Sequence, residues 1–314
     1  MKPSIRLVAL ILTSVACMVF AAAPAAAQGK EPSADEVQKI TAAAAQVQPQ
    51  VKPEKPRKLL VFSVAYGFWH TAIPYGKKAV EVLGAKTGAF EATVSDDLAN
   101  FEPEKLKEFD AVFFNNTNEE IFLPADFGKL AGDAKERAVK RDADLKKSLA
   151  AFIASGKGLA AIHAAVNSFR QWPEFGEILG ARFDNHPWGA GSIVTLKIDD
   201  PTHPVARAFK GQPFTVTDEI YQVKDPYSRQ VLRVLVSIDT AKTNMNVQGI
   251  NRKDGDFGMT WVKSYGQGRV FYNALGHEHN LFWNPTVLQH FLDGIQFALG
   301  DLKGDTTPSA KTAK

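Results

Sequence analysis

The sequence predicts an α/β fold in which a mainly parallel central sheet is covered by helices on both faces. Between residues 58 and 162, short apolar runs typical of buried strands alternate with segments of helical periodicity, which is the order that parallel βαβ units give. After residue 163, strand-like runs separated by Gly, Pro, Asn and Asp clusters predict β-rich insertions in the C-terminal half.

The elements follow one another along the chain from residue 58. The first buried strand is predicted over 58–64, with a helix over 73–86 behind it. We expect a charged, solvated insertion at 126–140 and an amphipathic helix at 142–155. Further strands are predicted at 90–95, 111–115, 158–162, 181–184, 192–198, 214–221, 231–238, 258–262 and 269–273, and a last helix at 285–299.

Residues 1–27 are typical of a secretory signal peptide. Lys2 and Arg6 precede an apolar run that ends near Ala23, and small residues lead to an expected cleavage site after Ala27. We therefore expect a periplasmic or secreted protein. The Ala/Pro-rich end argues against the alternative of a retained membrane anchor, and a lipid anchor at Cys17 is disfavoured by the sequence before it.

The remaining chain divides into three parts. Residues 28–57 are rich in Ala, Gln, Lys and Pro and predict a flexible linker with room for one helix. Residues 58–300 are expected to form a single domain, and the polar residues 301–314 a disordered tail. No apolar segment after the signal peptide is long enough to span a bilayer.

The composition excludes several classes of function. A net charge of +3 with 23% charged residues is too balanced for a nucleic-acid-binding protein. Cys17 is the only cysteine, so the mature chain has no thiol nucleophile. No Gly-rich fingerprint follows the first strand, which disfavours a nucleotide cofactor. Any chemistry must then use His, carboxylates, hydroxyls, amides or a bound metal.

Three histidines follow three separate predicted strands. They are His70, His163 and His277, and they share one edge of the sheet if those strands are parallel neighbours. Asp218 and Glu219 are the carboxylates most suited to join them. Such a group provides either acid–base catalysis or ligands for a divalent metal. The alternative for each histidine is a non-functional role, as a surface residue or as a hydrogen-bonded structural residue.

Candidate substrate contacts surround these histidine loops. Aromatic side chains beside polar groups suit the faces of sugars, although core or rim packing is the ordinary alternative. The candidates are Trp69, Asn116, His186, Trp188 and Tyr221. His290 is expected to be structural because it lies on the last helix.

These motifs resemble the ThuA-like (trehalose-utilisation) family, whose fold is similar to that of class I glutamine amidotransferases. The matching motifs run in family order through Gly67-Phe68-Trp69-His70, Asn116-Thr117, Gly158 to Ala165, Thr217-Asp218-Glu219-Ile220-Tyr221 and Gly268 to His277. The resemblance implies a flavodoxin-like three-layer sandwich over about residues 58–300. Amidotransferases have a Cys nucleophile at a strand-to-helix elbow, and His163 occupies the similar position here, so cysteine-dependent glutamine hydrolysis does not carry over.

The family link implies a small-molecule carbohydrate ligand. We expect an exported hydrolase, isomerase or lyase that acts on a saccharide or oxidised sugar, with His163 as proton carrier or metal ligand and Glu219 as its partner. A non-catalytic sugar-binding module of the cell envelope is the alternative. A purely structural domain without a working pocket is a third. The sequence leaves the oligomeric state open.

Overall fold

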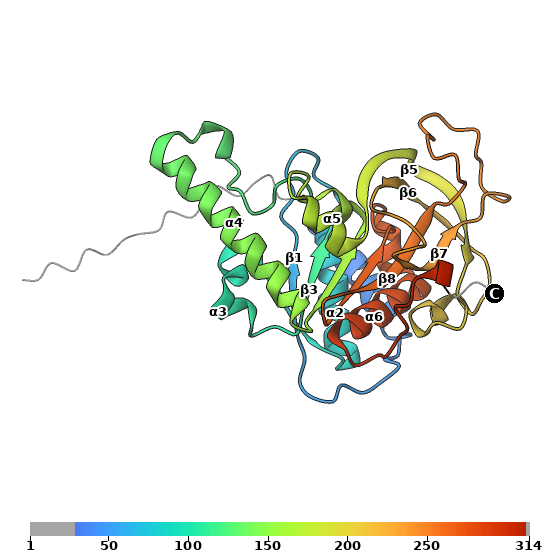
Figure 1. Cartoon of the computed structure of the whole chain (residues 1–314). Coiled ribbons are helices and arrows are strands. Elements are labelled where there is room, and N and C mark those ends of the chain that lie inside the picture. Colours follow the sequence, from blue (N-terminus) through green and yellow to red (C-terminus); the bar gives the residue numbers. More distant parts are fainter. Residues whose placement is uncertain (1–28, 312–314) are drawn as a thin grey trace, which may run out of the picture.

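The computed structural model describes residues 29–311. The predicted signal peptide and Cys17 lie outside these residues. Within them the strands form one sheet of nine strands in the order β2-β1-β3-β4-β9-β8-β7-β5-β6 (Figure 1). The strands are β1 (Lys58–Phe62), β2 (Glu91–Val94), β3 (Ala111–Asn115), β4 (Gly158–Ile162), β5 (Arg182–Ile198), β6 (Phe214–Lys224), β7 (Arg233–Ile238), β8 (Gly258–Tyr265) and β9 (Gly268–Asn273).

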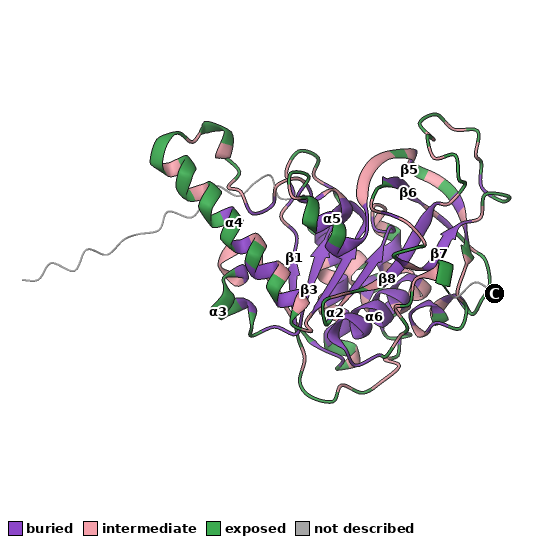
Figure 2. Cartoon of the chain, viewed as in Figure 1, coloured by how far each residue is buried: buried purple, intermediate pink, exposed green. Residues whose placement is uncertain are grey.

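The sheet has a parallel half and an antiparallel half. Strands β2, β1, β3, β4 and β9 pair in parallel, and β8, β7, β5 and β6 continue the same sheet with antiparallel pairing. All side chains of β3 and β4 are buried, as expected for parallel strands covered on both faces (Figure 2). The predicted α/β sandwich with a β-rich C-terminal half is confirmed.

Helices form the two outer layers. Helices α1 (Ala34–Ala44), α2 (Ile73–Thr87) and α6 (Pro285–Leu299) contact one another on one face of the sheet. The opposite face carries α3 (Pro103–Leu106), α4 (Gly132–Ala154) and α5 (Pro173–Leu179). Among residues 29–311, no helix is long and apolar enough to cross a membrane.

The segment expected to be a linker, residues 28–57, packs on the domain from residue 34 onward. Ser33 and Glu36 form a capping box at the start of α1, and Ile40 on this helix is fully buried. Helix α1 contacts α2 and α6. The Pro-rich chain that follows is also held, because Gln50 donates to the carbonyl of Pro204 at 2.7 Å.

The expected disordered tail also makes defined contacts as far as residue 311. Asp301 is buried in an ion pair with Arg57. Farther along, the amide of Ser309 donates to the carbonyl of Leu232 at 2.9 Å. Both ends of the described chain therefore pack against the sheet domain, which corrects the expectation of a free linker and tail.

Two element boundaries differ from the sequence prediction. The charged residues expected as an insertion continue into the next helix, so α4 is one helix of 23 residues whose N-terminal half is largely exposed. The two strands predicted around residues 185–189 are one long strand, β5, whose pairing with β6 is interrupted by register shifts. Such bulges let the β5–β6 ribbon bend, and Figure 1 shows it arching beside the upper end of the parallel strands.

Candidate functional site

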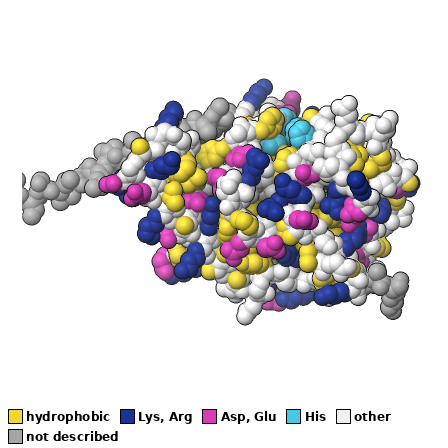
Figure 3. Space-filling model, turned by 45° about the horizontal axis from the view of Figure 1, so that its top comes forward, with side chains coloured by type: hydrophobic (Ala, Val, Ile, Leu, Met, Phe, Trp, Pro, Cys, Tyr) yellow, Lys and Arg dark blue, Asp and Glu magenta, His cyan; other side chains and the backbone are white. Residues whose placement is uncertain are grey.

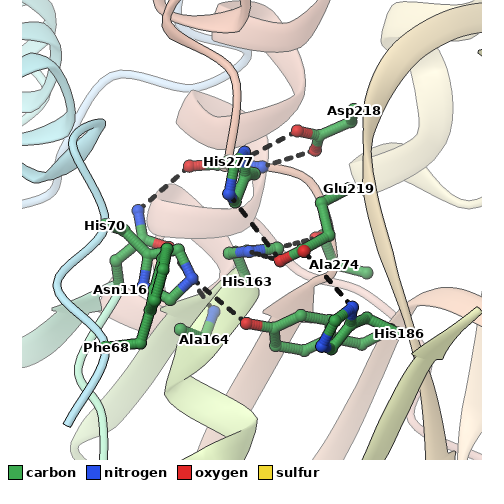
Figure 4. Close-up of polar contacts among 12 residues, drawn as sticks. Phe68, His70, Asn116, His163, Ala164, His186, Asp218, Glu219, Ala274 and His277 are labelled. Atoms are coloured by element: carbon green, nitrogen blue, oxygen red, sulfur yellow. Dashed lines mark hydrogen bonds and ion pairs between the residues drawn. The ribbon is translucent and has the colours of Figure 1, made fainter. Parts of the chain in front are cut away.

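Three histidines meet at the carboxyl edge of the parallel strands. His70 lies between β1 and α2, His163 directly follows β4, and His277 follows β9. Since β1, β3, β4 and β9 are parallel neighbours, the three loops emerge on the same edge. The imidazole ring centres lie 5.0, 5.4 and 5.5 Å apart (Figure 4).

His163 occupies a strained elbow between β4 and a short 3₁₀ turn. Its φ of 44° lies in the left-handed region that side chains other than glycine rarely adopt. The hydroxyl of Tyr272 donates to the His163 carbonyl at 2.8 Å and holds this backbone. The loop after β9 approaches closely because Gly276 has no side chain: a Cβ there would lie 3.2 Å from the Cβ of His163.

The hydrogen bonding of His163 fixes its tautomer. Nδ1 lies 3.0 Å from the carbonyl oxygen of Ala274, which can only accept, so Nδ1 carries the proton. Nε2 is fully buried and has no hydrogen-bond partner among residues 29–311. Burial lowers the pKa of His163, so the ring is neutral and Nε2 presents a lone pair.

Glu219 faces this lone pair from β6. Its Oε2 lies 3.5 Å from Nε2 of His163 and 3.8 Å from Nε2 of His277. The other oxygen, Oε1, lies 3.5 Å from Nδ1 of His186. Burial acts to raise the pKa of Glu219, but the contact with His163 and the other imidazoles outweigh it, so the net pKa is lowered. Glu219 is therefore a carboxylate surrounded by histidines.

Tyr221, two residues farther along β6, packs against two of these rings. Its hydroxyl lies 3.1 Å from Nε2 of His70, and its ring centre is 4.3 Å from that of His163. Burial lowers the pKa of His70 to about 2 and raises that of Tyr221, so both groups are neutral. Tyr221 was predicted to contact substrate, and the structure places it where it orients the imidazoles.

Asp218 was predicted to join the histidines, but it faces the other way. Neighbouring residues on a strand point to opposite sides of the sheet, so the side chain of Asp218 points away from the side that Glu219 occupies and into the protein interior. Its carboxylate accepts the backbone N–H groups of Gly276, His277 and Glu278 at 2.9, 3.1 and 2.9 Å. Burial raises the pKa of Asp218 to about 8, and these donors oppose the rise. Asp218 is a positioning residue for the loop that carries His277.

Asn116 and His186 hold different places at the site. Asn116 is fully buried, and its side-chain amide donates to the carbonyl of Gly276 at 3.0 Å, so it positions the same loop rather than offering a free substrate contact. His186 has a side chain that is 55% exposed and lies at the mouth of the cluster. Figure 3 shows histidine side chains at the surface in one place, whereas His70 and His163 are buried.

Neither predicted tryptophan lies among the imidazoles. Trp188 is 2% exposed, donates to the carbonyl of Asn244 at 3.0 Å and packs edge-on against Phe257, so it is a core residue. Trp69 is half-buried and lies beside Gly29.

Phe68 is a residue of the site that was not predicted from the sequence. Its ring is 63% exposed and lies edge-on to His70, with 4.8 Å between ring centres. In the sequence, the aromatic pair Phe68 and Trp69 directly precedes His70. Phe68 offers an exposed apolar face beside the buried cluster (Figure 4).

A cleft of about 900 Å³ lies elsewhere, between α3 and α4. Its walls include Leu106, Leu145 and Phe152 together with charged side chains such as Arg141. It contains no histidine. The chemistry-bearing groups therefore define the candidate site, rather than the size of this hollow.

The cluster has the composition of a metal site as well as an acid–base site. His70, Glu219 and His277 each offer one ligand atom, and these atoms all lie within 4.8 Å of one another. Imidazole and carboxylate groups are ligands for divalent transition metals. The same groups without a metal can exchange protons with a substrate.

Comparisons with known proteins agree with this fold. The family model described as ThuA, trehalose utilisation, matches residues 58–298. A ThuA-like protein from Bacteroides uniformis is 21% identical over 83% of this chain and 99% of its own, with a TM-score of 0.60. A ThuA-like protein from Parabacteroides merdae is 17% identical over 80% of this chain and 93% of its own, with a TM-score of 0.54. The comparison with curated proteins returned no match. Because the family model covers most of its length, the chain belongs to the ThuA family, as the sequence motifs predicted.

Proposed function

We propose that the protein is an exported carbohydrate-processing enzyme, a hydrolase, isomerase or lyase that acts on a saccharide or an oxidised sugar. The observation that carries this proposal is the buried, unpartnered Nε2 of His163, which faces the Glu219 carboxylate at 3.5 Å. The family's link with trehalose utilisation supports the class of substrate.

His163 is the general base of the proposed reaction. Its Nδ1–H is held by the carbonyl of Ala274, so a substrate proton can be taken only by Nε2. The imidazolium formed in this way is stabilised by the carboxylate of Glu219, and it then returns the proton as a general acid.

Phe68 and His186 are the proposed substrate contacts beside the histidine cluster. The exposed ring of Phe68 suits the apolar face of a sugar, and His186 offers a polar contact beside it. This assignment replaces the tryptophans expected from the sequence. Asp218, Asn116 and Tyr221 position the histidines.

Export is supported by the N-terminal pattern of Lys2 and Arg6, the apolar run and the small residues up to Ala27. The measurement is the mass of the full-length protein recovered from a periplasmic or culture fraction. A chain that starts at Gln28 is expected. Recovery of the uncleaved chain in the cytosol would contradict this part of the proposal.

The enzymatic proposal is tested with purified protein and a panel of disaccharides that includes trehalose and keto-sugar derivatives. Product formation followed by NMR is expected for the wild type and lost in His163→Ala and Glu219→Ala. His279→Ala is the matched control, since this histidine contacts Thr71 and Tyr75 instead. Saturable binding without product would replace the enzyme with a binding module, and equal activity in all variants would refute the assigned site.

A further inference from the structure

We infer that the histidine cluster binds one divalent first-row transition metal ion through His70, His277 and Glu219. The inference adds a cofactor to the site of the proposed function and rests on that cluster being the functional site. Metal binding itself is measured without any sugar.

The spacing of the donor atoms fits a single ion. Two ligand atoms on one tetrahedral ion lie about 3.4 Å apart at a metal–nitrogen distance of about 2.1 Å. Oε2 of Glu219 lies 3.8 Å from Nε2 of His277. The atoms offered by His70, Glu219 and His277 all lie within 4.8 Å of one another. Only small side-chain movements are needed to close the set around an ion.

The imidazole rings of His70 and His277 have a compatible separation. Two imidazoles on one tetrahedral ion have ring centres about 5.3 Å apart, given a metal–nitrogen distance of about 2.1 Å. The ring centres of His70 and His277 lie 5.4 Å apart.

An unpartnered nitrogen supplies an independent observation. Among residues 29–311, Nδ1 of His70 is buried without a hydrogen-bond partner. His70 is 2% exposed. Buried polar atoms are rarely left without partners, so this nitrogen calls for an explanation. A cation bound by His70 would provide one.

The surrounding contacts orient the ligands. Nε2 of His70 lies 3.1 Å from the Tyr221 hydroxyl. Backbone carbonyls and polar groups in this position fix the ring orientation of metal-binding histidines. Asp218 does the same for His277 through the backbone of its loop.

The donor set selects the class of metal. Two imidazoles and one carboxylate suit Zn²⁺, Co²⁺, Ni²⁺, Fe²⁺ or Mn²⁺ better than Ca²⁺ or Mg²⁺, which prefer oxygen ligands. A metal of this class would polarise a sugar oxygen beside His163 and Glu219.

Isothermal titration of the metal-stripped full-length protein with Zn²⁺ tests the inference. The wild type is expected to bind one Zn²⁺ per chain, and the Co²⁺ complex to show the visible absorption of a tetrahedral site. Glu219→Gln and His277→Ala are expected to weaken Zn²⁺ binding about 100-fold or more, whereas His279→Ala leaves it unchanged. Circular dichroism establishes that each variant is folded.

Two results would overturn the inference. One is a wild type that binds no stoichiometric Zn²⁺ or Co²⁺, and the other is equal binding by the wild type and by both ligand variants. Failure of the proposed function is separate. Sugar turnover by fully metal-stripped protein refutes the metal inference as a cofactor assignment and leaves the acid–base proposal standing, whereas Zn²⁺ binding without sugar turnover does the reverse.

Discussion

His290 makes the fold sensitive to acid, and this property can be measured away from the candidate site. The residue lies on α6 and is fully buried. Its Nδ1 donates to the carbonyl of Val205 at 2.7 Å, and its Nε2 accepts from the hydroxyl of Thr260 at 3.1 Å. Both ring nitrogens are therefore satisfied in the neutral form, and a second proton would displace the Thr260 donor.

The direction of the pH effect follows from the pKa. Burial lowers the pKa of His290 from 6.5 in the unfolded chain to about 4 in the folded protein. Below pH 6.5 the unfolded state binds the proton first, so the contribution of His290 to stability is complete above this pH and is lost as the pH falls toward 4. The loss is about 1.4 kcal/mol at pH 5.5 and about 2 kcal/mol at pH 5.0, with a limit of about 3.4 kcal/mol.

Urea unfolding of the wild type and His290→Gln between pH 7.5 and 5.0 measures this loss. The other titrating groups are common to both proteins, so the difference in unfolding free energy isolates His290. That difference should shift by about 1.4 kcal/mol toward the variant at pH 5.5. A difference that stays constant with pH would refute the reasoning. Should the Gln variant not fold, the NMR titration of the wild-type His290 ring decides, and a midpoint near 6.5 gives the same refutation.

Two further predictions test the packing and the positioning of the site. Gly158→Ala places a Cβ 2.1 Å from the backbone oxygen of Ala298, so calorimetry should show that the unfolding free energy falls by about 3 kcal/mol or more. Gly128→Ala is the control and should change the unfolding free energy little, because a Cβ there meets nothing within 4 Å. An equal effect of both variants would contradict the close approach of β4 and α6. Asp218→Ala leaves the backbone N–H groups of residues 276–278 without their acceptor. It should therefore lower the unfolding free energy by about 3 kcal/mol and weaken Zn²⁺ binding. An unchanged Zn²⁺ affinity would exclude the positioning role of Asp218.

The parallel half of the fold and its three histidines were predictable from the sequence because both depend on local patterns. Buried-strand runs alternate with helical periodicity, and each histidine directly follows one such run. The carboxyl ends of parallel neighbours meet at one edge whatever the details of packing. His70, His163 and His277 are therefore brought together by topology alone, and the structure places them there.

The contribution of β6 was harder to predict because it depends on the bending of an antiparallel ribbon. Nothing in the local sequence states that β5 and β6 reach the edge formed by β4 and β9. One part of the error was avoidable. Asp218 and Glu219 are consecutive in a predicted strand, and the alternation of side chains already required that only one of them face the histidines. The same ribbon places Trp188 in the core, where aromatic composition alone could not distinguish it from a sugar contact.

The order of the terminal segments could not be predicted from the sequence because the residues that they contact are remote along the chain. Ser33 and Glu36 cap the start of α1, but the burial of Ile40 depends on surfaces of α2 and α6 far along the chain. The ion pair between Arg57 and Asp301 likewise joins two polar segments, each of which its own composition predicts to be exposed to solvent. A polar composition predicts disorder only where the segment has no surface of the folded domain to pack against.

His163 concentrates several unfavourable features in one residue. A positive φ in a residue other than glycine costs about 1–3 kcal/mol. A buried nitrogen without a partner adds a further cost, and so does the carboxylate held opposite it. A purely structural elbow would be more stable with glycine at this position, since glycine needs no partner for a ring and adopts the backbone freely. Local rules broken together at the carboxyl edge of a parallel sheet are typical of functional sites. The elbow matches the position of the thiol nucleophile in the amidotransferase fold, and we propose that the imidazole of His163 transfers protons there through its unpartnered nitrogen.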